Sequence, residues 1–254
     1  MFVACSTLCF GRLSLEEALD VISELEFSKY EAALYEQGRQ LRPSEVAADI
    51  GRAAARLRHG PGLTPAAFAV EIDAASAAEH DRQLKAVCRL ARVSSVPLVT
   101  VKAAAAGTHL DAEIKRLQHL VDLAASDGIQ LSVSTITGTL TEDPDTALTL
   151  CQRVRGLSLT LDPSHFIAGP HPDKNHDALY PYVKHLHLRD TGRGPNQLQV
   201  RVGQGEVEYG RIIAQLARYQ YDRALCVDIY DIPDAPFAMQ SEVRKLKYLL
   251  ESLV

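Results

Sequence analysis

Two short stretches of this sequence carry several side chains that could do chemistry, LTLDPSHF (159–166) and VKHLHLRD (183–190). In the first stretch, alternating apolar residues are followed by Asp162, and His165 lies three residues later. In the second stretch, His187 lies between two leucines. Carboxylate oxygen and imidazole nitrogen are both ligands of divalent metals. Asp-Pro-Ser is also ordinary turn chemistry, and inward polar groups can bond to one another without a metal. The residue types therefore leave a metal site and a metal-free polar network open.

Short alternating runs with turn signals recur along the chain, and most are followed by a longer helical pattern. The predicted strands are Phe2–Thr7, Lys29–Tyr35, Phe68–Asp73, Leu98–Lys102, Ile129–Ser134, Leu157–Asp162, Val183–Arg189 and Leu225–Tyr230. The predicted helices are Leu15–Leu25, Ser44–Leu57, Ala77–Ala91, Leu110–Ala125, Pro144–Val154, Tyr209–Tyr219 and Gln240–Leu253. Strands that alternate with helices over about 250 residues predict an α/β fold, a single (β/α)8 TIM barrel spanning 1–254. A doubly wound sheet would need a glycine-rich turn after the first strand, and Cys-Phe-Gly-Arg does not supply one.

The alternation within the strands predicts which side chains share the inner face. Successive strand residues point to opposite faces, so the leucines of each strand separate from its polar residues. Ser134, Asp162, His187 and Asp228 fall on the polar faces near the C-terminal ends of four consecutive strands. Barrel enzymes keep their sites at that end. We therefore expect these four side chains to converge at the mouth of the barrel.

Composition narrows the classes of partner and compartment. The formal net charge of -5 argues against a nucleic-acid partner, because phosphate-backbone binding needs a basic face. Five scattered cysteines without a C-x-x-C pair suit reduced thiols in a cytoplasmic protein. The opening MFVACSTLCF has no charged lead and is too short for a signal peptide, and no segment is long and apolar enough for a membrane span. We expect a cytoplasmic protein without a membrane partner, and the sequence leaves homo-oligomerisation open.

The motifs LDPSHF, VKHLHLRD, Gly203-Gln-Gly-Glu-Val and LCVDIYD resemble the xylose isomerase-like barrel superfamily. Its members include sugar-phosphate isomerases and epimerases, inosose dehydratases, hydroxypyruvate isomerases and, more distantly, apurinic endonucleases. The opening STLCF with LSLEEALDVISELEF resembles their first strand and helix, so the resemblance covers essentially the full chain. It implies a small carbohydrate-like ligand and a divalent metal (Mn, Mg, Zn or Co). Gly203-x-Gly205 is too short for a nucleotide fingerprint, so no nucleotide cofactor is expected.

The resemblance also implies where the metal ligands stand. In the family, strands five to eight contribute Glu, Asp, His and Glu in turn. The Asp and His fall on Asp162 and His187, with His165 as the companion of the Asp, whereas Ser134 and Asp228 replace the two glutamates. Serine is a poor base without an activating partner, and aspartate is shorter than glutamate by about 1.5 Å. We therefore expect a weak, incomplete metal site formed by Asp162, His187 and Asp228.

Other inward or strand-end residues are candidates for the roles that the glutamates leave vacant. Arg189 shares the inward face of His187 and could bind a phosphate or carboxylate, or form a salt bridge with Asp162 or Asp228. Glu71 has the alternative of pairing with a neighbouring Arg or Lys. The candidate catalytic residues are Asp228, His165 and Glu71, and the candidate substrate-binding residues are Lys102, His109, Arg189 and Ser134.

Three functions follow from these features. The leading hypothesis is a sugar or sugar-phosphate isomerase or epimerase with an incomplete divalent-metal site at the barrel mouth. The alternative is a catalytically degenerate barrel that binds a carbohydrate-like ligand without turnover. An endonuclease-like phosphodiesterase is disfavoured, because it would need a basic surface and a multi-metal cluster richer in His and Glu.

Overall fold

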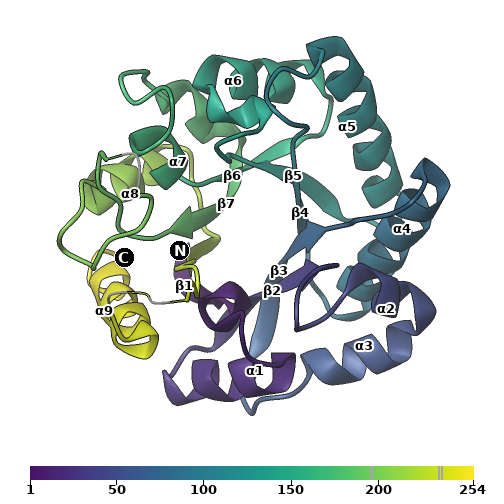
Figure 1. The fold of residues 1–254 in the computed structure, drawn as a ribbon, viewed down its shortest axis with the longest axis horizontal. Helices are drawn as coiled ribbons and strands as arrows, with labels where there is room; N and C mark the ends of the chain where they lie inside the picture. The colour runs from purple at the N-terminus through teal and green to yellow at the C-terminus, as the bar shows by residue number, and fades with distance from the viewer. Residues whose placement is uncertain (195–196, 234, 236) are drawn as a thin grey trace.

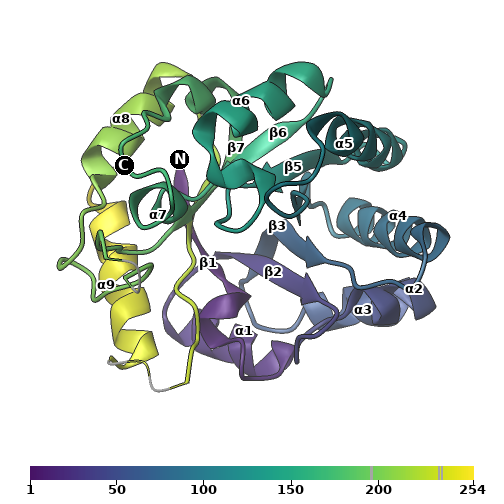
Figure 2. The same cartoon turned by 45° about the horizontal axis from the view of Figure 1, so that its top comes forward.

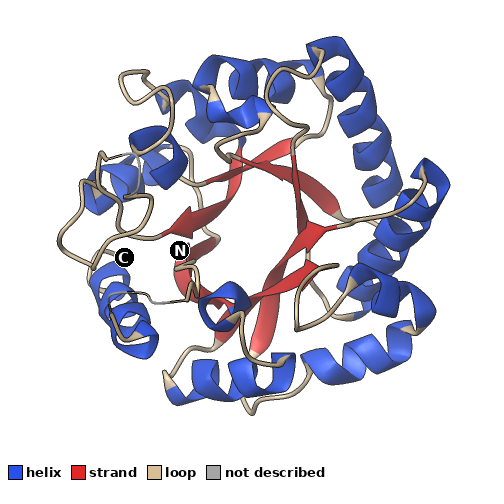
Figure 3. Ribbon diagram, viewed as in Figure 1, coloured by secondary structure: helices blue, strands red, loops and turns tan. Residues whose placement is uncertain are grey.

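The computed structural model describes residues 1–194, 197–233, 235 and 237–254. Eight parallel strands pair in sequence order, and the last pairs with the first to close a barrel (Figure 1, Figure 3). The strands are β1 (Phe2–Ser6), β2 (Lys29–Tyr35), β3 (Thr64–Glu71), β4 (Leu98–Lys102), β5 (Gln130–Ser134), β6 (Ser158–Leu161), β7 (Val183–Leu188) and β8 (Ala224–Val227). The predicted (β/α)8 fold is confirmed.

Helices surround the barrel on its outer side (Figure 2). They are α1 (Leu15–Glu24), α2 (Pro43–Ala48), α3 (Ile50–Leu57), α4 (Ala77–Val93), α5 (Leu110–Ala125), α6 (Pro144–Arg153), α7 (Ser164–Ile167), α8 (Tyr209–Arg218) and α9 (Met239–Glu251). The described residues also form the 3-10 helices η1 (Thr7–Phe10), η2 (Leu140–Glu142) and η3 (Asp177–Tyr182). The helix expected over Ser44–Leu57 is divided at Asp49, whose extended backbone ends α2 and whose carboxylate accepts from the Arg52 N–H to cap α3.

Strand ends differ from the predicted ends in a way that matters for the site. β6 ends at Leu161 and β8 ends at Val227, so Asp162 and Asp228 lie directly after the last paired residue of their strands. Arg189 likewise follows β7. The Asp228 N–H still donates to the Leu188 carbonyl oxygen at 2.9 Å, so this residue keeps its place beside β7.

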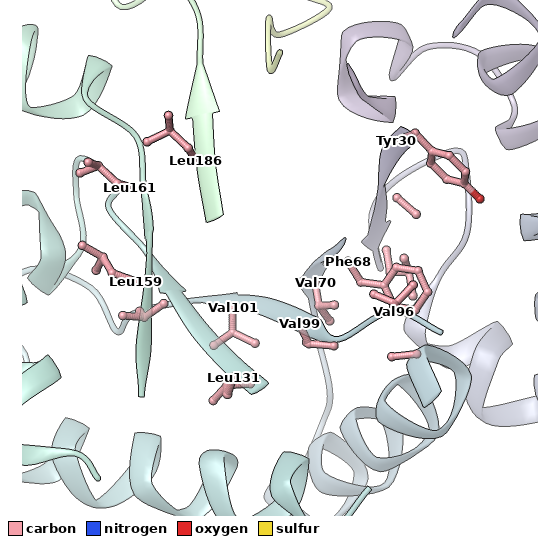
Figure 4. Packing of buried hydrophobic residues seen from close by; sticks show 14 of the residues in the cluster. Tyr30, Phe68, Val70, Val96, Val99, Val101, Leu131, Leu159, Leu161 and Leu186 are labelled. Carbon is pink, nitrogen blue, oxygen red and sulfur yellow. The ribbon is translucent and has the colours of Figure 1, made fainter. Parts of the chain in front are cut away.

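The apolar core lies between the strands and the helices, as the alternation predicts. Phe68, Leu131, Leu159 and Leu186 are buried there (Figure 4). Each fully buried side chain of this kind contributes about 1.5–3 kcal/mol.

The inside of the barrel is polar. Thr160 Oγ1 lies 2.8 Å from both Thr100 Oγ1 and Ser132 Oγ, which forms a buried hydroxyl network. Charged groups lie nearer the mouth, on the same inner face.

Among the described residues, no helix is both long and apolar enough to cross a membrane. All five cysteines are buried, unpaired thiols.

Candidate functional site

The four inward positions expected at the mouth do meet there. Ser134, Asp162, His187 and Asp228 line one small cavity of about 20 Å³ at the C-terminal end of the strands. Thr135 helps to position Asp162, because the Thr135 hydroxyl accepts a hydrogen bond from the Asp162 N–H at 2.7 Å. A cavity of this size holds about one water molecule. The space between these side chains is therefore too small for a sugar.

Arg189 occupies the space between the two aspartates. Its Nη1 lies 2.7 Å from Asp162 Oδ2, and its Nη2 donates to Asp228 Oδ2 at 2.6 Å. Its Nε donates to the Asp228 carbonyl oxygen at 2.7 Å, and its guanidinium lies over the Tyr230 ring, 4.0 Å from the centroid. The Arg189 side chain is fully buried. The sequence left Arg189 either to bind a ligand anion or to form a salt bridge with Asp162 or Asp228. In the structure Arg189 forms salt bridges with both aspartates.

These contacts set the charges of the cluster. Burial raises the pKa of the Asp162 carboxyl, but Arg189, His165, His187 and the hydrogen bond from Ser164 together outweigh burial and hold the pKa below its usual range. Burial lowers the pKa of Arg189, and the two carboxylates more than offset this, so its pKa lies above the ordinary value. Asp162 is thus a carboxylate and Arg189 a cation at neutral pH.

An acidic residue that the sequence analysis did not identify also lies beside the mouth. Glu31, on β2, accepts from His187 Nε2 at 2.9 and 3.0 Å, and His185 Nε2 lies 2.7 Å from its Oε2. Burial lowers the pKa of His187, but Glu31 and Asp228 outweigh it and raise the pKa to about 9. Burial raises the pKa of Glu31, and the two imidazoles reverse this to well below the usual range. The sequence offered one signal for this role, the single glutamate Glu31 at the start of the otherwise apolar run EAALY.

The remaining candidates lie at different places around the mouth. His165 is buried next to the cluster, with Nε2 3.6 Å from Asp162 Oδ2 and with Nδ1 accepting from the Thr137 N–H at 3.2 Å. Burial lowers the pKa of His165. Lys102 also lines the cavity and forms a salt bridge of 2.7 Å with Glu71; we call these two the rim pair. His109 is exposed at the start of α5 and does not line the cavity.

The aspartate of the HLRD motif supports the loop that follows β7. Asp190 Oδ2 accepts from the N–H groups of Gly203 and Gly205 at 2.7 and 3.0 Å, and Oδ1 accepts from the Thr191 N–H at 3.1 Å. The two glycines therefore lie in a turn that Asp190 holds. Asp190 is fully engaged with backbone, which removes it from the set of free carboxylates.

The expected metal ligands can be tested against these contacts. We call Asp162, His187 and Asp228 the mouth trio; their ligand atoms lie within 4.8 Å of one another, close enough to share an ion. Both aspartates are, however, bound to Arg189, and His187 is an imidazolium, whereas a ligating imidazole must be neutral. The mouth trio does not fit a divalent metal while Arg189 stays in place.

Comparisons with known proteins agree with the architecture. No curated protein is significantly similar to the chain. A solved xylose isomerase-like TIM barrel protein from Mycobacterium smegmatis, in complex with magnesium, superposes with a TM-score of 0.77 at 18% identity, over 99% of this chain and 97% of that one. An L-ribulose 3-epimerase gives 0.74 at 16%, over 100% and 96%. A probable 3-DHS dehydratase from Bacillus anthracis gives 0.71 at 14%, over 99% of each.

At these identities the structural likeness establishes the fold alone. A sequence model goes further, because the one describing the xylose isomerase-like TIM barrel matches residues 19–249. The chain therefore belongs to the xylose isomerase-like TIM barrel family.

Proposed function

We propose that this protein binds a carbohydrate-like ligand at the mouth of its barrel and does not catalyse metal-assisted epimerisation. The observation that carries the proposal is the Arg189 guanidinium, which bonds both Asp162 and Asp228. Epimerisation needs one group to remove a proton and another to return it. Asp228 is held in a buried salt bridge, and Ser134 has no acid–base group of its own.

The class of ligand is inferred from the relatives and from the rim pair. Similar solved structures are described as an L-ribulose 3-epimerase, a D-tagatose 3-epimerase-like protein and a 3-keto-D-glucoside 4-epimerase. The side chains of Lys102 and Glu71 are 41% and 44% exposed, and Lys102 Nζ lies 5.6 Å from the centroid of the Tyr35 ring. An ammonium donor, a carboxylate acceptor and an aromatic ring suit a hydroxyl-rich ligand. Because the cavity below holds only about one water, we place the ligand against the rim pair.

Binding is tested with a thermal-shift panel of aldoses, ketoses and their phosphates, followed by calorimetry on any compound that stabilises the protein. We expect at least one compound to bind, and Lys102→Ala to weaken its binding at least fivefold. Lys115→Ala, an exposed lysine on α5, is the matched control and should bind normally. A panel without any binder would contradict the ligand class, and normal binding by Lys102→Ala would contradict the placement.

Turnover is tested by solvent deuterium incorporation into the same ketoses and ketose phosphates. The wild-type protein is expected to show no exchange at the carbon next to the carbonyl, with or without added Mn²⁺. Robust exchange would show that the protein does transfer this proton and would contradict the proposal.

A second function, metal-dependent isomerisation or epimerisation, is favoured by two specific observations. Asp228 Oδ1 is buried without a hydrogen-bond partner, and the mouth trio spans only 4.8 Å. In this case Asp228, His165 and Glu71 would be the catalytic groups, and Arg189 would have to leave both aspartates before a metal could bind. Single Ala substitutions of the three, measured by deuterium exchange, would identify the base.

A further inference from the structure

A separate group of ligand-type side chains lies deeper in the barrel than the mouth trio. We call Glu31, His185 and Cys226 the lower trio; they come from β2, β7 and β8, and their ligand atoms lie within 4.8 Å of one another. All three are at most 2% exposed. His185 precedes His187 by two residues on β7, so the lower trio lies one layer closer to the N-terminal end of the strands.

The lower trio contains a buried polar atom without a hydrogen bond. His185 Nε2 lies 2.7 Å from Glu31 Oε2 in an ion-pair contact, and within the described part of the chain it makes no hydrogen bond. The Cys226 thiol has only a 3.8 Å contact with the carbonyl oxygen of the next residue. A buried ring nitrogen that makes no hydrogen bond is unfavourable. A cation between these groups would satisfy it.

We propose that Glu31, His185 and Cys226 bind a thiolate-preferring transition-metal ion such as Zn²⁺ or Co²⁺. Thiolate, imidazole and carboxylate together suit such ions, with bonds of about 2.3, 2.0–2.1 and 2.0–2.2 Å respectively for zinc. Closing onto a shared ion requires the side chains to approach by about 1 Å. Glu31 Oε2 would bind the ion while Oε1 keeps its 2.9 Å bond to His187. Binding releases the thiol proton of Cys226 to solvent.

We infer that the ion enters from the end of the barrel opposite the mouth. A cavity of about 150 Å³ lies there, and His185 and Ala224 are among its lining residues. Lys184 and Arg223 also line it, and their positive charges oppose the entry of a cation. Loading is therefore expected to be slow, and spectra are to be followed until they stop changing.

The test is titration of the intact protein with Co²⁺, because a thiolate-to-cobalt charge-transfer band in the near ultraviolet reports a sulfur ligand directly. We expect this band at one equivalent of Co²⁺, displacement of the ion by Zn²⁺, and a rise in Tm on loading. Cys226→Ser should lose the band. Cys151→Ser removes a buried thiol outside the lower trio and should keep it.

The outcomes separate this site from the mouth trio. Cobalt bound by the mouth trio has no sulfur ligand, so binding without the band places the ion outside the lower trio and overturns the proposal. A band that persists in Cys226→Ser, or its absence from folded wild-type protein at equilibrium, also overturns it. His185→Gln provides a second variant, which should weaken binding at least tenfold if the imidazole is a ligand. The result does not depend on the proposed function, since neither carbohydrate binding nor turnover enters the measurement.

Discussion

At the scale of single residues, Arg189 decides the chemistry of the mouth. It lies between Asp162 and Asp228 with contacts of 2.7 and 2.6 Å, and none of the three side chains is appreciably exposed. Buried ion pairs gain little over apolar packing, but removing one partner leaves the other charges uncompensated. Arg189 thus supplies the positive charge that a divalent metal would otherwise supply to these carboxylates.

Replacing this guanidinium should make room for a metal. Arg189→Ser is expected to lower the free energy of unfolding by about 3–5 kcal/mol, because two carboxylates lose their cation. Mn²⁺, which accepts oxygen and nitrogen ligands, should then raise the Tm of the variant and leave the wild-type Tm nearly unchanged.

The control for this experiment is Arg189→Ser combined with Asp162→Asn, in which Mn²⁺ should give a much smaller shift. Equal Mn²⁺ stabilisation of wild type and Arg189→Ser would show that the guanidinium does not compete with a metal.

His187 gives the stability a dependence on alkaline pH. Its pKa is raised from 6.5 to about 9 in the folded protein, so its contribution is fully present below pH 6.5 and is lost as the pH rises through about 9. The total loss is about 3 kcal/mol. Chemical denaturation between pH 6 and 10 should show this decline in wild type and a flatter profile in His187→Gln. The exposed His109→Gln should keep the wild-type slope, and a wild-type profile that rises over this range would contradict the assignment.

At the scale of elements, the loop after β7 is held by a side chain that follows the strand. Asp190 binds the backbone of Gly203 and Gly205, and the Thr191 carbonyl accepts from the Glu206 N–H at 2.7 Å. A methyl group on Gly205 would overlap Asp190 Oδ1 and the Thr191 backbone, so only glycine fits here without a shift. The connection to α8 is thereby fixed close to the mouth.

Gly205→Ala is therefore expected to destabilise the protein by about 1–3 kcal/mol, as overpacking usually does. Gly210→Ala is the matched change, because nothing lies within 4 Å of its added methyl and alanine favours the helix α8. We expect it to be neutral or to stabilise by up to about 1 kcal/mol. Denaturant titration compares the two, and equal stabilities would mean that the loop yields readily.

At the scale of the whole molecule, the barrel depends on the seam between its first and last strands. Phe2, Val3, Ala4 and Cys5 of β1 pair with residues 224–227 of β8, and α9 packs over both strands. Val243, Leu246 and Leu250 of α9 are completely buried. The last helix therefore contributes to the closure of the barrel.

Leu246→Ala should cost about 2–5 kcal/mol, because the seam cannot easily collapse around the cavity. Tyr248→Ala, on the same helix but 52% exposed, should change stability by no more than about 1 kcal/mol. Thermal and chemical denaturation of the two variants provide the measurement. A small effect of Leu246→Ala would indicate that α9 is not needed to hold the seam.

The sequence by itself determined the barrel and the inward face of the mouth. Alternation within strands is a local property, so it assigned Ser134, Asp162, His187 and Asp228 to one face, and the parallel order brought them to one end. The loop role of the glycines after β7 was also predictable, because turn chemistry is local.

Only the tertiary structure decided which charges pair. Periodicity orders residues along a strand but says nothing of distances across the barrel, and Glu31 reaches His187 over 156 positions of sequence. For the same reason the sequence could not tell whether Arg189 pairs with Asp162 or with Asp228, because the pairing of a guanidinium with a carboxylate depends on their positions in three dimensions. The pairing of Arg189 with Asp162 and Asp228 depends on how the strand ends meet across the mouth. It determines whether the two aspartates contact a metal or an arginine.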